Sequence, residues 1–278
     1  MKYGLLISFV AFIWAGSFIA VKIAVKEVDP VTLAFLRFAI ASPLMAAAVF
    51  LFNKDAKIKK LNHIPYIVII ALTGVTLLYI LQFYGIKYTK ASNAGVLINM
   101  NVLFIAILSV IFLKEKMNSM KFAGIIMGFA GAAIIVSPTF SINLNMGNIL
   151  ILLSAFSWAV YSIVGKKLLE EYDAITITTY AFIIGTLAFI PFLHFPARIS
   201  LKSWTCILYL AILCSVFGYV AWYKALEKME ASKVAIYLNL IPLFSIILAF
   251  FILKEAITLS IIAGAILIMI GIYLTEKA

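Results

Sequence analysis

Ten long apolar segments, separated by short polar stretches, constrain the fold of this sequence more than any other feature. Each runs for about 18 to 25 residues, the length that an α-helix needs to cross the hydrocarbon core of a bilayer. The acidic residues fall between these segments or at their ends. The sequence therefore predicts an all-α integral membrane protein with ten transmembrane helices, over residues 4–24, 31–52, 64–86, 91–113, 119–137, 147–168, 174–194, 203–225, 231–253 and 258–275.

The composition agrees with a lipid environment. Hydrophobic residues make up 65% of the chain and charged residues only 12%, whereas soluble domains carry roughly 25% charged residues. The net charge of +11 does not indicate a nucleic-acid partner, because the lysines are scattered singly among short loops. We therefore expect the lipid bilayer as a partner and no nucleic acid.

The distribution of positive charge predicts the orientation. An even number of spans places both termini on one side of the membrane, and that side holds 14 of the 22 lysines and arginines. Positively charged loops stay in the cytoplasm. We expect a multi-pass protein of the cell (plasma or inner) membrane with both termini cytoplasmic.

The sequence offers no chemistry typical of an enzyme or a metal site. Cys206 and Cys214 lie in one apolar run, about 12 Å apart along a helix, which is too far for a disulfide. No CxxC or Cys/His spacing suggests a metal, and no mid-span nucleophile or acid–base pair suggests catalysis. We predict no metal, no cofactor and no enzymatic activity.

Two stretches of the chain occur twice. "AFIWAGSFIAVKIAVKEVD", residues 11–29, aligns with "AFSWAVYSIVGKKLLEEYD", residues 155–173, at an offset of 144. "ASNAGVLINMNVLFIAILSVIFLKE" from Ala91 aligns with "ASKVAIYLNLIPLFSIILAFFILKE" from Ala231. These matches indicate a tandem duplication, with one five-helix unit over 1–140 and another over 145–278.

An odd number of helices in each unit inverts the second unit relative to the first. Inverted repeats are typical of secondary transporters, in which the two halves enclose one substrate site near the bilayer midplane. The architecture predicts alternating access around a central cavity. A lipid or lipid-linked sugar flippase shares these requirements, and a receptor or a subunit of a larger complex is the more distant alternative.

The duplicated stretches, together with "FLRFAIASP" in the second span, resemble the drug/metabolite transporter superfamily in its EamA-like branch. The resemblance covers essentially the whole chain. It implies export or exchange of small metabolites, with amino acids prominent and sugars, nucleotide-type compounds and cationic drugs also represented. The ninth span departs from its partner by carrying Pro242 where the fourth has Val102, which favours a kink in the ninth helix over one in the fourth.

Polar and aromatic residues within the spans are the candidates for a substrate cavity. Asn99 and Asn239 occupy matching faces of the duplicated helix, which favours a place in the cavity wall, with hydrogen bonding to a neighbouring helix as the alternative. The aromatic residues also recur as repeat mates, with helix packing as the alternative for each. The predicted substrate-binding residues are Trp14, Ser17, Tyr79, Gln82, Ser92, Asn99, Trp158, Tyr219, Trp222, Tyr237 and Asn239.

Arg37, about two turns into the second span, is a possible charge contact for an anionic or zwitterionic carboxylate. Its position instead favours snorkelling to the outer interface or a structural role. The spans hold no mid-span Asp or Glu, and His63 and His194 lie at helix ends. Because coupling to protons or sodium normally uses such groups, the sequence predicts a facilitator or exchanger with any proton coupling indirect.

Glycines in the fifth and tenth spans allow close helix contact. They include Gly124, Gly131, Gly264 and Gly271. Contact within one chain is favoured over a dimer interface. The glycines do not distinguish a monomer from a homodimer, and we expect one of the two. The expected partner in either case is a small-molecule substrate.

Overall fold

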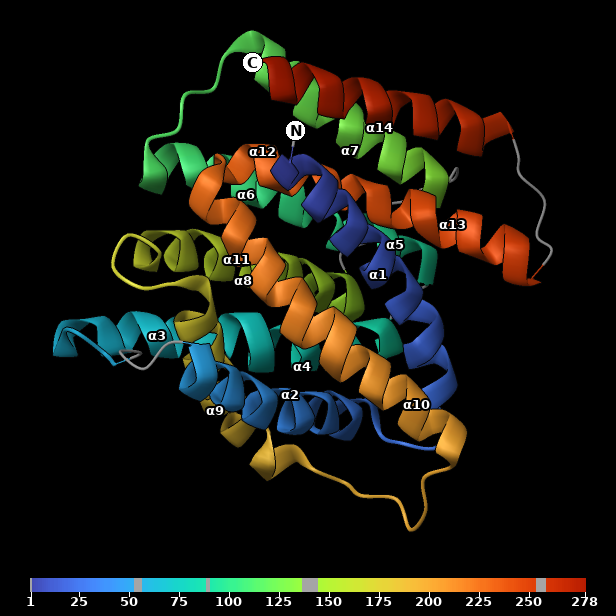
Figure 1. Ribbon diagram of the computed structural model, residues 1–278. Helices are drawn as coiled ribbons and strands as arrows, with labels where there is room; N and C mark the ends of the chain where they lie inside the picture. Colours follow the sequence, from blue (N-terminus) through green and yellow to red (C-terminus); the bar gives the residue numbers. More distant parts are fainter. Residues whose placement is uncertain (1, 53–56, 89–90, 137–144, 254–258) are drawn as a thin grey trace.

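The computed structural model describes residues 2–52, 57–88, 91–136, 145–253 and 259–278, and the regular structure within these ranges is entirely helical. The α-helices are α1 (Lys2–Ala24), α2 (Pro30–Phe52), α3 (Ile64–Ala71), α4 (Leu77–Tyr88), α5 (Ala91–Ile98), α6 (Met100–Leu113), α7 (Ser119–Val136), α8 (Met146–Leu168), α9 (Ala174–Ala188), α10 (Leu201–Tyr209), α11 (Gly218–Lys228), α12 (Ala231–Ala235), α13 (Leu240–Leu253) and α14 (Leu259–Lys277). Figure 1 shows them as one bundle, with the two chain ends close together.

These helices form the ten predicted spans. Nine stretches of the described chain are long and apolar enough to cross a membrane, and α9 supplies a shorter apolar helix. The bundle also turns large apolar side chains outward: Phe50 and Leu201 are 77% and 84% exposed. Soluble proteins rarely expose apolar surface on this scale. The prediction of an all-α, ten-helix membrane protein is confirmed.

Matching caps start the second helix of each repeat. Asp29 accepts backbone hydrogen bonds from Val31 and Thr32 before α2, and Asp173 accepts them from the residues that begin α9. An aspartate at this position satisfies amide groups that the first helical turn leaves unpaired. The two repeats therefore begin their second spans with the same device.

The third and eighth spans are interrupted at matching places by π-helical segments, Leu72–Thr76 and Leu210–Phe217. The ninth span is interrupted by the 3₁₀ segment Ile236–Asn239. The fourth is interrupted as well, between α5 and α6 at Asn99.

The expectation that favoured a kink in the ninth span over one in the fourth is therefore wrong, because both spans are interrupted. Pro242 lies in the first turn of α13, where a helix does not need the missing amide. The interruption comes before the proline, at a position that the two repeats share. The interruption does not depend on the proline. Val102 in place of a proline therefore does not make the fourth helix continuous.

Helices α7 and α14 pack backbone against backbone (Figure 1). A Cβ atom on Gly124 would lie 2.7 Å from the carbonyl oxygen of Gly271, and one on Gly131 would lie 2.5 Å from that of Gly264. The contact is reciprocal, because Gly124 and Gly131 are the repeat mates of Gly264 and Gly271. The prediction that these glycines serve contact within one chain is confirmed.

Several residues touch their own repeat mates. The hydroxyl oxygens of Ser42 and Thr186 lie 3.0 Å apart at a sequence offset of 144. The rings of Phe38 and Phe182, at the same offset, have centroids 5.0 Å apart. A residue can contact its own mate only on the axis that relates the two repeats. These pairs therefore mark a pseudo-twofold axis through the centre of the bundle.

Candidate functional site

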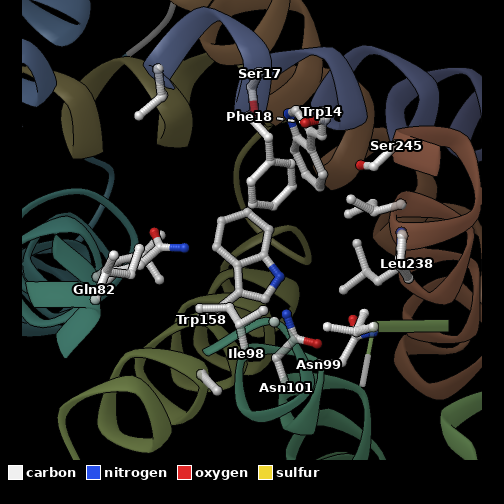
Figure 2. Close-up of a pocket in the computed structure, with 18 of the residues that line it drawn as sticks. Trp14, Ser17, Phe18, Gln82, Ile98, Asn99, Asn101, Trp158, Leu238 and Ser245 are labelled. Atoms are coloured by element: carbon white, nitrogen blue, oxygen red, sulfur yellow. Dashed lines mark hydrogen bonds between the residues drawn. The ribbon is translucent and has the colours of Figure 1, made fainter. Parts of the chain in front are cut away.

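A cavity of about 480 Å³ lies between the two repeats, beside this axis. Its wall takes residues from α1, α2, α4, α5, α6 and α7 of the first repeat and from α8, α11, the 3₁₀ segment Ile236–Asn239 and α13 of the second. Figure 2 shows the Trp158 indole at its centre, between Gln82 on one side and Leu238 and Ser245 on the other. The volume falls within the range of roughly 300–1,000 Å³ that is usual for small-molecule sites.

Two pairs of repeat mates build the aromatic part of the wall. The rings of Trp14 and Trp158 meet edge to face, with centroids 5.5 Å apart and an interplanar angle of 83°. The hydroxyl oxygens of Tyr79 and Tyr219 lie 3.3 Å apart. All four side chains line the cavity, as the duplication predicted for residues near the axis.

The π-helical segments hold two of these aromatics in place. The Trp14 indole Nε1 donates to the carbonyl oxygen of Cys214 at 3.0 Å, and the Tyr219 hydroxyl donates to that of Gly74 at 2.9 Å. Gly74 and Cys214 are repeat mates within the two π segments. Because a π turn disturbs the regular backbone ladder, it presents carbonyls to side chains from other helices.

The polar part of the wall comes mainly from positions that the repeats do not share. Ser17, Gln82 and Asn99 were predicted here and do line the cavity. Asn101 and Ser245 line it too, and neither was predicted, because their repeat mates, Ile241 and Ile105, are apolar. A polar residue near the middle of a span was the only signal available for them.

Arg37 is buried against this wall. It is 5% exposed, and its Nε donates to the Ser215 hydroxyl at 2.5 Å. Its guanidinium carbon lies 4.9 Å from the centre of the Tyr79 ring. Of the two roles that the sequence favoured for Arg37, snorkelling to the interface is wrong, because the side chain turns inward to a hydrogen bond and an aromatic face. These contacts agree with the other, a structural role.

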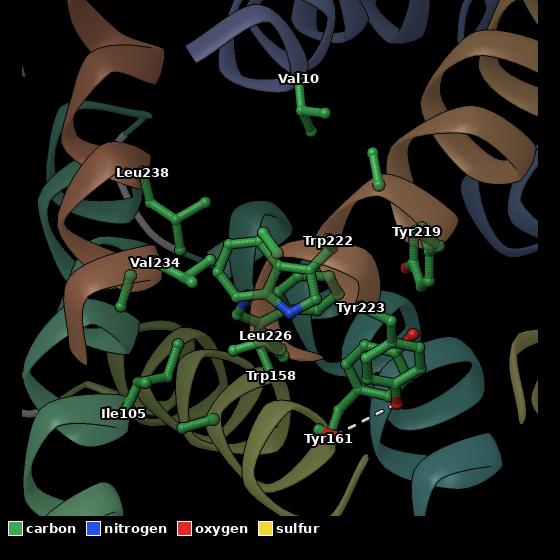
Figure 3. Close-up of a cluster of buried hydrophobic side chains, with 14 of the residues drawn as sticks. Val10, Ile105, Trp158, Tyr161, Tyr219, Trp222, Tyr223, Leu226, Val234 and Leu238 are labelled. Atoms are coloured by element: carbon green, nitrogen blue, oxygen red, sulfur yellow. Dashed lines mark hydrogen bonds between the residues drawn. The ribbon is translucent and has the colours of Figure 1, made fainter. Parts of the chain in front are cut away.

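Four of the predicted residues lie elsewhere or are not described. Trp222 is fully buried among the hydrophobic side chains of Figure 3 and does not line the cavity. Its Nε1 donates to the Ser162 hydroxyl at 3.2 Å. The Tyr237 hydroxyl donates to Glu276 at 3.0 Å, near the chain ends. Asn239 is fully buried against Gly128. The side chain of Ser92 lies outside the described part of the structure.

A charged cluster closes the bundle at the end that holds the termini. The Glu115 carboxylate accepts hydrogen bonds from the backbone amides of Ala231 and Ser232, at 2.5 and 3.2 Å, and from the Ser232 hydroxyl at 2.7 Å. Lys166 Nζ lies 3.3 Å from the same carboxylate. We call Glu115, Lys166, Ala231 and Ser232 the Glu115 cluster. It ties the loop after α6 to α8 and to the start of α12.

The hydrogen bonds of the Glu115 cluster favour the ionised carboxylate. Burial alone would raise the pKa of the Glu115 carboxyl, but the bonds from Ser232 and Ala231 and the charge of Lys166 together hold that pKa below its ordinary value of 4.5. Glu115 therefore carries its charge at neutral pH.

Ten membrane-spanning helices in two inverted repeats, with a small-molecule cavity between them, define a polytopic membrane transporter. The model of the EamA-like transporter family matches the chain twice, over residues 1–137 and 145–276. The chain belongs to this family, which confirms the resemblance seen in its sequence.

Its relatives agree with this assignment. An uncharacterized transporter of Archaeoglobus fulgidus is 42% identical over 99% of this chain and 97% of its own length. A probable terminal-alkyne amino-acid exporter of Streptantibioticus cattleyicolor is 25% identical over 95% of this chain and 90% of its own length. One solved crystal structure has a TM-score of 0.84, covering 100% of this chain and 97% of that one, at 18% identity. That likeness is one of fold alone.

Proposed function

We propose that this protein is a secondary transporter of small metabolites, amino acids or related compounds, and that it works by alternating access around the central cavity. The observation that carries the proposal is the position of the cavity, which lies beside the axis that relates two inverted repeats. In that position a rocking of one repeat against the other exposes the same site first to one side of the membrane and then to the other.

The chemistry of the wall supports a small amphiphilic solute. Aromatic rings at Trp14 and Trp158 offer apolar contact, while Gln82, Asn99 and Asn101 offer amide donors and acceptors. The Streptantibioticus relative, named a probable amino-acid exporter, supports the choice of amino acids or related compounds. Facilitated exchange, without a coupling ion bound in the cavity, is the mode we propose.

A lipid or lipid-linked sugar flippase is the second candidate, since the same architecture serves it. The cavity volume of about 480 Å³ suits a ligand of drug-like size better than a whole lipid. Export of cationic compounds is less favoured, because the buried positive charge of Arg37 repels a cation from the same wall.

Counterflow in proteoliposomes tests the proposal. Vesicles loaded with an unlabelled metabolite should accumulate the same labelled metabolite from outside, without any imposed ion gradient. A panel of amino acids and their derivatives tests transport and cargo together. Trp158→Ala should lower the initial rate, whereas Trp204→Ala, which replaces a tryptophan that does not line the cavity, should not.

Two results would contradict the metabolite carrier. If no solute in the panel exchanges while a fluorescent phospholipid crosses the bilayer, the flippase is the better description. If uphill transport requires a pH gradient and is lost in Glu115→Gln, the carrier is proton-coupled and not a facilitator or exchanger.

A further inference from the structure

The cavity wall is chemically asymmetric although the fold is symmetric. Four of its polar residues have apolar repeat mates. The pairs are Arg37 with Ala181, Gln82 with Trp222, Asn101 with Ile241 and Ser245 with Ile105. A gating role that alternates between the repeats needs the same residue in both copies. A polar residue that is present in one repeat alone makes the two sides of the cavity chemically different. Such residues can bind a solute in a single orientation.

Arg37 is the strongest of these asymmetric features. Its guanidinium carbon lies beside two neighbouring rings, 4.9 Å from the centroid of the Tyr79 ring and 5.0 Å from that of the Phe38 ring. Its Nε donates to the Ser215 hydroxyl, and Tyr79 is a second hydrogen-bonding neighbour of the guanidinium, which carries five donors in all. A charge held this deep in a membrane protein is costly and marks a functional position. A planar fork of donors matches the geometry of a carboxylate, which it binds through two parallel hydrogen bonds.

The rest of the wall suits an apolar body next to that carboxylate. Trp14 and Trp158 present their rings to the cavity, and Phe18 and Phe83 widen the apolar surface. Figure 2 shows Phe18 and Trp14 above the Trp158 indole, with Asn99 and Asn101 below it. A solute with a charged head and a hydrophobic or aromatic body satisfies both parts of the wall.

Asn101 and Ser245 offer a second polar contact. The Asn101 side-chain oxygen and the Ser245 hydroxyl are buried, and neither finds a hydrogen-bond partner among the described residues. Both residues line the cavity. Buried polar atoms are normally paired, so these two are available to an ammonium or hydroxyl group of the solute.

We propose that Arg37 is the residue that determines specificity, and that it binds the carboxylate of a solute whose hydrophobic or aromatic body lies against Trp14 and Trp158. The proposal rests on the transport function proposed above and names its substrate class as hydrophobic carboxylates. These are either amino acids, with the ammonium group at Asn101 and Ser245, or the corresponding carboxylic acids without an amino group.

Binding of three matched compounds to the purified full-length protein, measured by titration calorimetry, tests this assignment. 3-Phenylpropionate carries the carboxylate, 3-phenylpropanamide replaces it with a neutral group of the same shape, and L-phenylalanine adds the ammonium group. We expect the amide to bind roughly 10- to 100-fold more weakly than the acid, as the loss of a charge-assisted hydrogen bond implies. L-Phenylalanine binding more tightly than 3-phenylpropionate identifies amino acids as the source, and the reverse order identifies the acids without an amino group.

Variants of Arg37 test whether this residue causes the preference for the carboxylate over the amide. Arg37→Gln should abolish the preference for the acid over the amide, and Arg37→Lys should retain part of it, because lysine keeps the charge but not the planar fork. Arg198→Gln is the matched control, since Arg198 is exposed and lies away from the cavity. If Arg37→Gln fails to fold, the comparison of acid with amide in the wild type still decides.

Equal binding of acid and amide, or binding of neither, overturns the proposal, as does an unchanged preference in folded Arg37→Gln. The counterflow assay separates this failure from a failure of the transport function. Exchange of a solute without a carboxylate, independent of Arg37, keeps the transporter and rejects the role of Arg37. Arg37-dependent binding without exchange of any solute keeps the site and rejects transport.

Discussion

At the scale of single residues, the site consists of a repeated set and an unrepeated set. The repeated aromatics Trp14, Trp158, Tyr79 and Tyr219 meet across the axis. Two of them are fixed to π-segment carbonyls. The unrepeated residues give the cavity its polarity. Symmetry thus explains which residues form the centre of the molecule, and the departures from symmetry indicate what the centre recognises.

Asn99 and Asn239 are repeat mates that differ in accessibility. Asn99 lines the cavity, whereas Asn239 is fully buried against Gly128. In a background without Cys206 and Cys214, Asn99→Cys should therefore react with a water-soluble thiol reagent much faster than Asn239→Cys. Substrate should protect the cysteine at position 99. Faster labelling at position 239, or none at either position, would contradict the cavity described here.

The sequence gave Asn99 and Asn239 the same predicted role, but in the structure only Asn99 lines the cavity. The reason lies in the local helix geometry. Ile236–Asn239 forms a 3₁₀ turn, in which each residue rotates about 20° further than in an α-helix, so four residues turn the side chain by roughly 80°. Identical sequence patterns therefore point in different directions, and only coordinates reveal the difference.

At the scale of elements, the ends of the spans were predicted to within about three residues where charged and polar residues mark them. The seventh is the exception, because α9 ends at Ala188 and the prediction ran to residue 194. The interruptions inside spans were not predicted. The π segments Leu72–Thr76 and Leu210–Phe217 contain no proline, and the break at Asn99 precedes Val102. Such breaks depend on tertiary partners for their freed carbonyls, as with Trp14 and Cys214. A hydropathy pattern carries no information about those partners.

The α7–α14 contact depends on glycine. In Gly131→Ala the new methyl group would lie 2.5 Å from the Gly264 carbonyl oxygen, and backbone cannot move aside as a flexible side chain can. We expect a loss of about 1–3 kcal/mol of stability from this overpacking, measured as a lower thermal midpoint in detergent. Ala123→Leu, at an exposed position of the same helix, is the control. An unchanged midpoint in Gly131→Ala would show that α7 and α14 are not in close contact in solution.

The Glu115 cluster closes the end of the bundle near the termini. In Glu115→Gln the charge that attracts Lys166 is lost. Glutamine has one acceptor oxygen, so it can accept either the bond from Ala231 or the bonds from Ser232 as neutral hydrogen bonds, and the others are lost. Hydrogen bonds to charged groups are worth about 1.5–3 kcal/mol and neutral ones about 1 kcal/mol, so the amides at the start of α12 should exchange with solvent faster. Hydrogen exchange read by mass spectrometry measures this. Glu170→Gln, on an exposed residue, should leave the exchange of α12 unchanged.

The same cluster sets a pH dependence. Because the folded-state pKa of Glu115 is below 4.5, its stabilising contribution is complete above that pH and is lost as the pH falls through the lowered value. Lys166, Lys121 and Glu230 are the other charged groups nearby. Protection of α12 should therefore stay constant from pH 8 to about pH 5 and fall below about pH 4.5. A decline that begins near neutrality would point to another titrating group.

At the scale of the whole molecule, the duplication carries most of what the sequence could predict. Five helices in each copy dictate inversion, inversion dictates an axis in the membrane plane, and the axis predicts a central site. The contacts between repeat mates, such as Ser42 with Thr186 at 3.0 Å, show that axis directly. The duplication does not predict the substrate, because the residues expected to distinguish one solute from another are those that differ between the two repeats.

The orientation in the membrane follows from the charge asymmetry and is open to direct measurement. The side that carries the termini holds 14 of 22 basic residues, so we expect it to face the cytoplasm. Green fluorescent protein fused after Ala278 should fluoresce, and alkaline phosphatase at the same place should be inactive. Insertion of the two reporters near His194, in the loop between α9 and α10 on the opposite side, should give the reverse pattern. The opposite result would place the Glu115 cluster, which lies at the end of the termini, outside the cell.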